Sequence, residues 1–202
     1  MTTPFDLLAA DYRRLWSDAP AGRSQRSEIW RHIDPLFQLG DHILDLGCGI
    51  GDDALHFAER GVEVFGIDIS EQMVEAAQAC GVHARRLALE DLDKLEGPYS
   101  GAISNFGALN CVADLRGIAA QLARLVQPGG AVALCVMGKL APLDWRHALN
   151  RWSGHTNWRG LDIYYRSSRE MRAAFGSGFA FRKRASIGWG DHQLYVFRRP
   201  TH

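Results

Sequence analysis

Apolar runs alternate with amphipathic segments through most of the chain. Short runs rich in Val, Ile and Leu, bounded by glycine or acidic residues, predict buried parallel strands that begin at Ile43 and cover 62–67, 82–87, 102–106 and 131–137. Apolar positions at helical spacing predict helices around 24–37, 54–58, 73–77 and 115–126, with Pro35 ending or bending the first. Repeated strand–helix units of this kind imply an α/β domain built on a parallel sheet.

The last third of the chain has a different pattern. Ser167 and Glu170 form a capping box, which predicts a short helix through Phe175, followed by a hairpin of 179–187 and 193–198. Before this helix, residues 138–165 lack clear periodicity and are dense in Trp, His and Arg. A segment in that position overhangs the carboxyl ends of the strands, where open α/β sheets bind their ligands. We therefore expect residues 138–165 to form a substrate lid.

Three glycines spaced two apart follow the first strand directly. Gly47, Gly49 and Gly51 occupy the strand-to-helix turn, where the missing Cβ lets the backbone approach a ligand and permits a positive φ. The second strand ends in Asp68, and an acid in that position can accept two hydrogen bonds from a ribose diol. These features predict a nucleoside pocket. The alternatives are a tight turn that binds nothing and, for Asp68, a helix cap or a solvated loop acid.

The spacing and charge of the glycine loop favour one kind of nucleoside. Dinucleotide folds use G-x-G-x-x-G to seat a pyrophosphate on a helix N-terminus. This chain has glycine at every second position instead, with Asp45 before the loop and Asp52 and Asp53 after it. Carboxylates repel pyrophosphate and attract a ligand that carries an ammonium and a sulfonium. Helix-dipole effects alone also account for Asp52 and Asp53 in a first helical turn.

An acidic residue followed by G-x-G-x-G, with a second acid at the end of strand two, resembles the first motif of the class I S-adenosylmethionine-dependent methyltransferases. The similarity extends to LEDL at 89–92, SNFGALN at 104–110 and QPGG at 127–130, and it covers the chain from Leu36 to Met137. The family uses S-adenosyl-L-methionine, so the resemblance implies this cofactor.

The resemblance also implies a fold and a division of the chain. The family has a three-layer, Rossmann-like α/β architecture, with a seven-stranded, mostly parallel sheet whose last strand is antiparallel. We expect a single methyltransferase domain over 1–202. Its parts would be an N-terminal helical cap at 1–35, a cofactor-binding core at 36–137, the lid at 138–165, and a C-terminal helix and hairpin at 166–202.

The same resemblance implies roles for individual residues. A carboxylate from Glu90 or Asp91 would read the adenine amino group while an apolar side chain covers the ring. Asn105, Phe106 and Gly107 would line the methionine moiety and the transferred methyl group. The full set of expected cofactor-binding residues is Asp45, Gly47, Cys48, Gly49, Gly51, Asp68, Ile69, Met73, Glu90, Asp91, Leu92, Asn105, Phe106, Gly107 and Asn110.

Three of these assignments have structural alternatives. Asp45 either contacts the cofactor or orients the glycine loop by accepting backbone N–H bonds. Phe106 either attracts the sulfonium through its ring or fills the core as an ordinary buried phenylalanine. Residues 89–92 are otherwise an ordinary polar loop.

Composition limits the expected cellular compartment and the expected binding partners. Lys plus Arg and Asp plus Glu are equal at 23 each, so nothing in the overall charge favours nucleic acid as a partner. The four cysteines, Cys48, Cys80, Cys111 and Cys135, are scattered without a C-x-x-C pair, and the N-terminus lacks signal-peptide features. No apolar run approaches the roughly 20 residues that span a bilayer. We expect a cytoplasmic protein with a small-molecule acceptor and no membrane partner; the oligomeric state stays open.

Catalytic residues are hard to assign because methyl transfer from a sulfonium is an in-line displacement that depends mainly on alignment and a dry site. No metal is required, and a base is needed only when the acceptor arrives protonated. Weak candidates are His147 and His155 in the lid and Tyr12 near the N-terminus, where Trp16 would help to close the pocket.

The lid region and the segment after it carry two further side-chain groups. The aromatic side chains form either a stacking surface for the acceptor or a small satellite core; they are Trp145, Trp152, Trp158, Tyr164 and Tyr165. The arginines form either an anion clamp or a solvated face; they are Arg146, Arg151, Arg159, Arg166, Arg169 and Arg172.

Three other functions compete with small-molecule methylation. A regulatory or scaffold protein could keep the cofactor pocket without turnover. A protein or RNA methyltransferase is disfavoured by the balanced charge and by Asn-Phe-Gly-Ala at 105–108 in place of an Asn-Pro-Pro-aromatic tetrad. A nicotinamide dehydrogenase shares the fold class, but the glycine spacing and the neighbouring acids argue against it.

Overall fold

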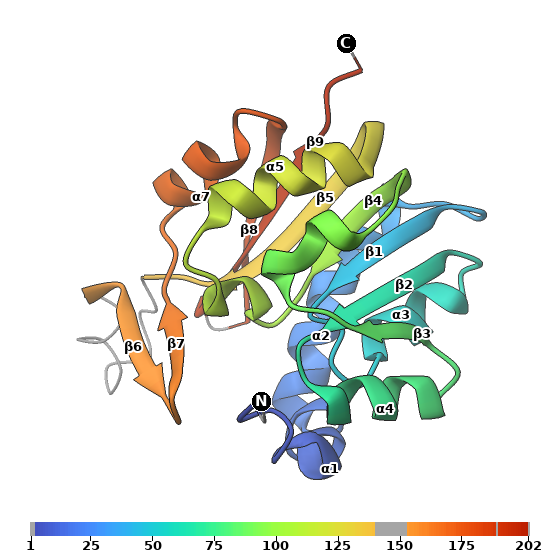
Figure 1. The fold of residues 1–202 in the computed structure, drawn as a ribbon, viewed down its shortest axis with the longest axis vertical. Helices are drawn as coiled ribbons and strands as arrows, with labels where there is room; N and C mark the ends of the chain where they lie inside the picture. The colour runs from blue at the N-terminus through green and yellow to red at the C-terminus, as the bar shows by residue number, and fades with distance from the viewer. Residues whose placement is uncertain (1–2, 140–152, 189, 202) are drawn as a thin grey trace.

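The computed structural model describes residues 3–139, 153–188 and 190–201, and a seven-stranded sheet forms its centre (Figure 1). The strands lie in the order β3 (His83–Arg86), β2 (Glu63–Asp68), β1 (His42–Leu46), β4 (Tyr99–Ser104), β5 (Val126–Met137), β9 (His192–Arg198) and β8 (Ala180–Ile187). All run in one direction except β9, which is antiparallel to both of its neighbours. The predicted fold, with its antiparallel last strand, is confirmed.

Helices cover both faces of this sheet. Figure 1 shows α5 (Leu115–Leu125) and α7 (Ser168–Phe175) in front of it, and the η3 turn (Leu89–Lys94) packs into the same core. Behind it lie α2 (Pro20–Ile33) and α3 (Asp52–Ala58), with α4 (Glu71–Ala79) beside them. Because apolar layers cover both faces, the central strands are apolar on both sides, which explains their unbroken apolar runs. Across the described residues, every helix is too short or too polar to span a bilayer.

Alternation along β1 decides where its one acidic residue lies. Leu44 and Leu46 belong to the core on the α5 side, whereas Ile43 belongs to the core on the α2 side. Successive strand residues point to opposite faces, so Asp45 shares the α2 face with Ile43. It lies near the carboxyl end of the strand, directly before the glycine loop.

The N-terminal helix differs from its predicted extent of 24–37. The chain first forms α1 (Ala9–Tyr12) and the wide turn η1 (Arg13–Ser17), and α2 already begins at Pro20. Proline suits the first helical position, where its missing N–H leaves no bond unmade. The helix ends at Ile33, and Pro35 lies in the short turn η2 (Asp34–Leu36).

The predicted lid contains a hairpin that the sequence pattern did not indicate. Strands β6 (His155–Trp158) and β7 (Leu161–Tyr164) pair antiparallel and form a separate small sheet. Most of the β6 side chains are exposed, so no apolar alternation marks it. The remaining lid residues, 140–152, lie outside the described part of the chain.

Asn110 joins this hairpin to the main sheet. It lies in the turn η4 (Ala108–Cys111) and is fully buried. Its Nδ2 donates to the carbonyls of Met137 at 3.0 Å and Tyr164 at 2.6 Å, and its Oδ1 accepts the Met137 amide at 2.8 Å. Both amide protons and one oxygen lone pair of Asn110 are thus engaged within the protein, which gives the side chain a structural role; its expected role in cofactor binding stays a prediction.

Replacing Asn110 by alanine should remove the side-chain partner of the Met137 amide and of the Tyr164 carbonyl, while the Met137 carbonyl keeps the Arg166 amide at 3.1 Å. We expect the free energy of unfolding in urea to fall by about 2–4 kcal/mol, since each buried unsatisfied group costs about 1–3 kcal/mol. Asn157→Ala is the matched control, because Asn157 makes two comparable bonds in the exposed hairpin turn, where water can replace them. Equal losses in the two variants would contradict the role assigned to Asn110.

Candidate functional site

The glycine loop lies at the carboxyl end of β1 and is held against β2. The amides of Gly47 and Cys48 both donate to the carbonyl of Ile67, at 2.8 and 2.9 Å. Gly47 has φ +78°, and a Cβ there would lie 2.2 Å from the Cβ of Ala108, so only glycine fits. At Gly49, with φ +53°, a Cβ would have no atom within 4 Å, so the loop presents bare backbone to open space.

Asp68 fixes the loop from the end of β2. Its Oδ2 accepts the Gly49 amide at 2.9 Å, and its Oδ1 accepts the Ser70 amide at 2.9 Å. The helix cap of α4 is Ser70, whose Oγ accepts the Met73 amide, so Asp68 is not itself that cap. Burial raises the pKa of Asp68, and the amide hydrogen bonds offset part of that rise. Each carboxylate oxygen keeps a second lone pair that a diol can use.

Two buried side chains at the same edge have polar atoms without a partner. Asp45 is 1% exposed, and its Oδ2 makes no hydrogen bond to any described residue. Asn105, the residue after β4, is 5% exposed, and neither its Oδ1 nor its Nδ2 is hydrogen-bonded within the described chain. Buried polar atoms are rarely left unpaired, so these atoms mark a position for a polar ligand.

The charge of Asp45 is costly in the free protein. Burial raises its pKa well above the ordinary value, the neighbouring Asp53 and Asp68 raise it further, and Arg26 opposes the rise. No loop amide donates to Asp45; within the described residues the loop amides bond Ile67 and Asp68 instead. Two roles were considered for Asp45, contact with the cofactor and acceptance of hydrogen bonds from the loop amides. The structure does not show the second.

Arg26 pairs with the two acids that begin α3. Its guanidinium, on α2, lies 3.2 Å from Asp52 and 3.2 Å from Asp53, and only 9% of the residue is exposed. Trp30 also donates its indole N–H to Asp53 at 2.7 Å. Asp52 and Asp53 are thus neutralised within the protein, and the expectation that they help to attract a cationic ligand is corrected. Asp45 and Asp68 are then the acids left to attract a cationic ligand.

Phe106 adopts an unusual backbone conformation directly after Asn105. Its φ is +54°, a region that L-residues rarely enter. The Arg26 guanidinium lies over its ring, 4.6 Å from the centroid, and the ring is partly exposed. One side of the ring therefore already has a cation, so its predicted attraction to a sulfonium would need the other side or the edge.

Comparison with known proteins supports the predicted family. Residues 43–130 match the family model described as a methyltransferase domain, and this stretch contains the glycine loop, Asp68 and Asn105. Residues 43–130 of this chain therefore form a methyltransferase domain, which agrees with the class I S-adenosylmethionine-dependent family and the cofactor predicted from the sequence.

Individual methyltransferases share the core but not the full length. The chain is 37% identical to the 27-O-demethylrifamycin SV methyltransferase of Amycolatopsis mediterranei (strain S699), over 47% of this chain and 38% of that protein. It is 32% identical to the tRNA 5-carboxymethoxyuridine methyltransferase of Escherichia coli (strain K12), over 64% and 54%. The chain thus spans about half the length, or less, of these relatives.

A solved methyltransferase structure supports the fold over the whole chain. The CcbJ methyltransferase of Streptomyces caelestis superposes with a TM-score of 0.76, covering 98% of each chain at 18% identity. The similarity therefore reaches beyond the core to the N-terminal helices and the C-terminal strands, although at this identity it concerns the fold alone.

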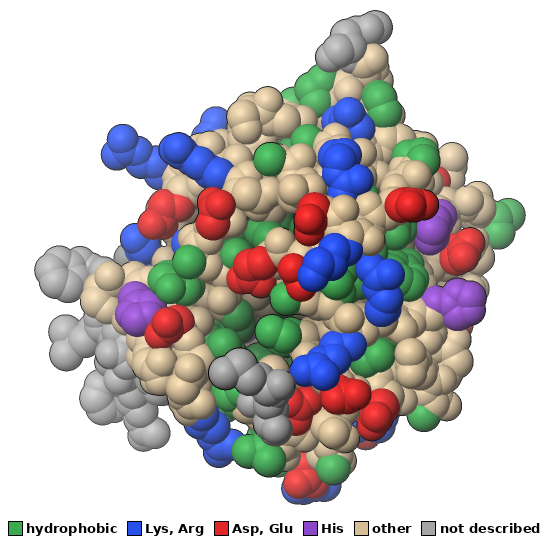
Figure 2. Space-filling model, in the orientation of Figure 1, with side chains coloured by type: hydrophobic (Ala, Val, Ile, Leu, Met, Phe, Trp, Pro, Cys, Tyr) green, Lys and Arg blue, Asp and Glu red, His purple; other side chains and the backbone are tan. Residues whose placement is uncertain are grey.

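The residues expected at the methyltransferase adenine subsite are placed unequally. Ile69, just after Asp68, is 48% exposed and offers an open apolar side chain. Glu90 is exposed, whereas Asp91 pairs with Lys94 at 2.9 Å. Leu92 is fully buried in the α5-side core, so its side chain is not open to a ligand, and its place in the adenine subsite stays a prediction. Figure 2 shows a hollow on this face, between the β6–β7 hairpin and α4, where apolar side chains gather below acidic ones.

The remaining residues expected to bind the cofactor are buried or lie in turns near the glycine loop. Met73 is 2% exposed and Cys48 is 7% exposed, so neither presents an open side chain. Burial raises the pKa of the Cys48 thiol, which keeps it protonated. Gly51, at the N-terminus of α3, has φ +86°, and Gly107, before η4, has φ +88°, so both act through their turns.

The weak catalytic candidates lie in different surroundings. His147 falls outside the described residues. His155 lies on the hairpin, 48% exposed, with Nε2 3.1 Å from Asp162. Burial raises the pKa of Tyr12, and Arg26, Asp52 and Asp68 all act on it, so its phenol lies near the loop. Trp16 is 57% exposed, and its expected part in closing the pocket stays a prediction.

The lid arginines and aromatic residues do not form one cluster within the described residues. Arg166 is buried with its guanidinium over Tyr164 and bonded to the Val112 carbonyl, while Arg159 lies over Trp158. Arg172, on α7, lies over the ring of Phe181 on β8. The members that lie outside the described part of the chain are Trp145, Arg146, Arg151 and Trp152.

The N-terminal segment contributes a contact that sequence reasoning missed. Asp6 accepts the Ser70 hydroxyl at 2.6 Å and the Gln72 amide at 3.3 Å, next to the Asp68 clamp. Burial raises the pKa of Asp6, but these hydrogen bonds and those from Thr3 outweigh it and lower the pKa to about 2. Phe5 meets Trp158 of the hairpin at 5.8 Å, so this segment links α4 to the lid region. A lone acid in an irregular segment gave no signal in the sequence.

Asp45→Asn should separate stability from ligand binding. The raised pKa means that the folded protein binds more protons than the unfolded one above pH 3.8, so its stability falls as pH rises through the folded pKa. Removing the charge should therefore raise the free energy of unfolding at pH 7, by on the order of 1 kcal/mol. The rise in Tm caused by S-adenosylhomocysteine should shrink at the same time. An unchanged ligand-induced rise, or a lower Tm without ligand, would contradict this role; Asp93→Asn at the surface serves as control.

Proposed function

We propose that this chain transfers a methyl group from S-adenosylmethionine to a small-molecule acceptor by in-line displacement. When bound, the cofactor supplies an electrophilic methyl carbon on a sulfonium. The proposal rests chiefly on the clamp between Asp68 and the Gly49 amide, which leaves bare backbone beside a carboxylate that can grip a diol. The unpartnered atoms of Asp45 and Asn105 lie at the same edge of the sheet, where the amino-acid part of the cofactor would lie.

The residues present fit this group chemically. Asp45 and Asp68 are buried acids whose charged forms are disfavoured in the free protein, and a cationic ligand would favour those forms. Asn105 offers one donor and one acceptor, which suits an ammonium and a carboxylate together. Cys48 and Ala54 pack behind the loop and exclude water from it. The protein's contribution would then be alignment and a dry site.

Two observations bear on the acceptor. One relative methylates a rifamycin derivative and another is named for a tRNA nucleoside, so the relatives include both acceptor classes. The balanced charge of 23 basic and 23 acidic side chains favours the small molecule. The contact between Phe5 of the N-terminal segment and Trp158 of the hairpin also favours a small acceptor, because this contact would leave less room for a macromolecule to reach the proposed site. The division into cap, core and lid, and the cytoplasmic setting, stay predictions.

Calorimetry with S-adenosylhomocysteine tests the cofactor site. We expect Asp68→Ala to weaken binding at least 100-fold, because it removes both the diol partner and the anchor of the Gly49 amide. Asp93→Ala, at an exposed position without a side-chain hydrogen bond in the described structure, should bind as the wild type does. Wild-type affinity in the Asp68 variant would refute the ribose assignment.

Labelling distinguishes the competing functions. Incubation of the wild type with methyl-labelled S-adenosylmethionine and cell extract should put label into low-mass products. Label found mainly in precipitated polymer would instead support an RNA or protein acceptor. Binding without transfer in any extract would support a scaffold role.

A further inference from the structure

A histidine just before the predicted strand 193–198 lies at the same edge of the sheet as the proposed cofactor site. His192 begins β9 and pairs in register with Met137, the last residue of β5. Leu194 and Val196 of the same strand belong to the α2-side core, so His192 lies on that face too. This is also the face of Asp45.

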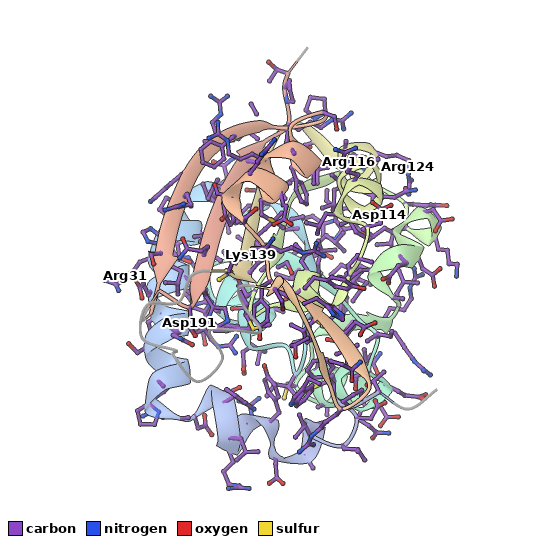
Figure 3. The ribbon with its side chains drawn as sticks, turned by 90° about the vertical axis from the view of Figure 1, so that its left-hand side faces the viewer. Arg31, Asp114, Arg116, Arg124, Lys139 and Asp191 are labelled. Atoms are coloured by element: carbon purple, nitrogen blue, oxygen red, sulfur yellow. The ribbon has the colours of Figure 1, made fainter. Side chains whose placement is uncertain are left out.

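One acid lies beside the imidazole. Nδ1 of His192 is buried and lies 3.1 Å from Oδ2 of Asp191, which is an ion-pair distance without the geometry of a hydrogen bond. Asp191 in turn accepts the side-chain amide of Gln25, on α2, at 3.4 Å. Figure 3 shows Asp191 at the lower end of the β8–β9 ribbon beside α2, well away from the labelled residues of α5. An acid beside one nitrogen of an imidazole favours its protonated form and leaves the other nitrogen for chemistry.

The imidazole also lies next to the residue expected beside the reacting groups. Its ring meets the Phe106 ring edge-on, with centroids 6.2 Å apart and planes at 67°. Phe106 follows Asn105, whose side chain has no partner in the described structure. The side chain of His192 is 13% exposed, and because Nδ1 is buried, Nε2 is the nitrogen open to a ligand.

The other charged and titratable groups near His192 are engaged elsewhere or neutral. Arg26, across the Phe106 ring, is neutralised by Asp52 and Asp53. Glu28 of α2 accepts the Gly188 amide in the β8–β9 turn. Burial raises the pKa of the Cys135 thiol of β5, so it stays neutral. Asp191 is therefore the acid placed to stabilise an imidazolium.

We propose that His192, supported by Asp191, is the base that takes the proton from the methyl acceptor. This rests on the proposed methyl transfer. The acceptor heteroatom forms a bond to the methyl carbon, the carbon–sulfur bond breaks with its electron pair left on sulfur, and the acceptor proton moves to Nε2. The acceptor is thus a group that arrives protonated, such as a phenol, an alcohol or a thiol. A carboxylate or a tertiary amine would not need this residue.

The test compares His192→Gln with His56→Gln. His56 is a matched control because its Nε2 lies 2.7 Å from Asp34 and its side chain is 17% exposed, but it stacks on Trp30 away from the loop. With labelled S-adenosylmethionine and the low-mass fraction of cell extract, we expect transfer to fall about 100-fold or more in the His192 variant. The Kd for S-adenosylhomocysteine should change less than about twofold in both variants.

A second readout does not depend on turnover. Addition of S-adenosylhomocysteine to the wild type should shift the ring ¹H–¹⁵N signals of His192 and leave those of His56 unmoved. Wild-type transfer by His192→Gln, or unmoved His192 signals, would overturn the assignment of the base. A wild type that binds S-adenosylhomocysteine but never transfers label would instead overturn the proposed function, and the base role with it.

Discussion

The hydrogen bond from the Gly49 amide to Asp68 is the constraint on which the site depends. It joins the loop after β1 to the end of β2, and the second oxygen of Asp68 accepts the amide that begins the turn into α4. The Asp68 carboxylate thus fixes both the backbone of the glycine loop and the beginning of α4. Since the loop has no side chain at Gly49, the backbone held in this way is also the surface a ligand meets.

Charge compensation makes this arrangement tolerable. Four acids, Asp45, Asp52, Asp53 and Asp68, gather where the first strands end, and buried like charges are expensive. Arg26 from α2 pairs with the two on α3, so the remaining unfavourable charge is concentrated on Asp45 and Asp68. The buried acids Asp45 and Asp68 lower the stability of the protein without ligand. A bound cation would offset this cost, so affinity for the cation is gained at the expense of stability in its absence.

The sequence predicted what local patterns determine. Buried runs and glycine spacing were enough for the order of strands and helices in the core, the loop, and Asp68, since these follow from burial and backbone conformation. The structural roles of Leu92 and Asn110 were not foreseen, because a motif position does not show which way a side chain points; Leu92 packs into the core, and Asn110 joins β5 to β7 by hydrogen bonds. Arg26 and Asp6 were missed because their partners lie far away in the chain.

His192 shows the same limit from another side. The predicted strand began at residue 193 and left His192 in the turn before it, and only the antiparallel pairing of β9 with β5 brings it to the edge where β4 ends. Strand pairing between distant parts of the chain decides which side chains meet at a site, and the pattern of a single sequence does not show that pairing. The hairpin β6–β7 was missed for the opposite reason, because its exposed side chains leave no apolar alternation to detect.

Proton release on ligand binding tests the central electrostatic claim most directly. S-adenosylmethionine, which carries the sulfonium as well as the ammonium, should be titrated calorimetrically without an acceptor into the wild type and Asp45→Asn at about pH 5, in two buffers of different ionisation enthalpy. A cationic ligand lowers the raised pKa values of Asp45 and Asp68, so binding to the wild type should release protons, and the variant should release fewer. Identical heats in both buffers for the wild type would show that these acids do not meet the ligand's charge, and would contradict the account.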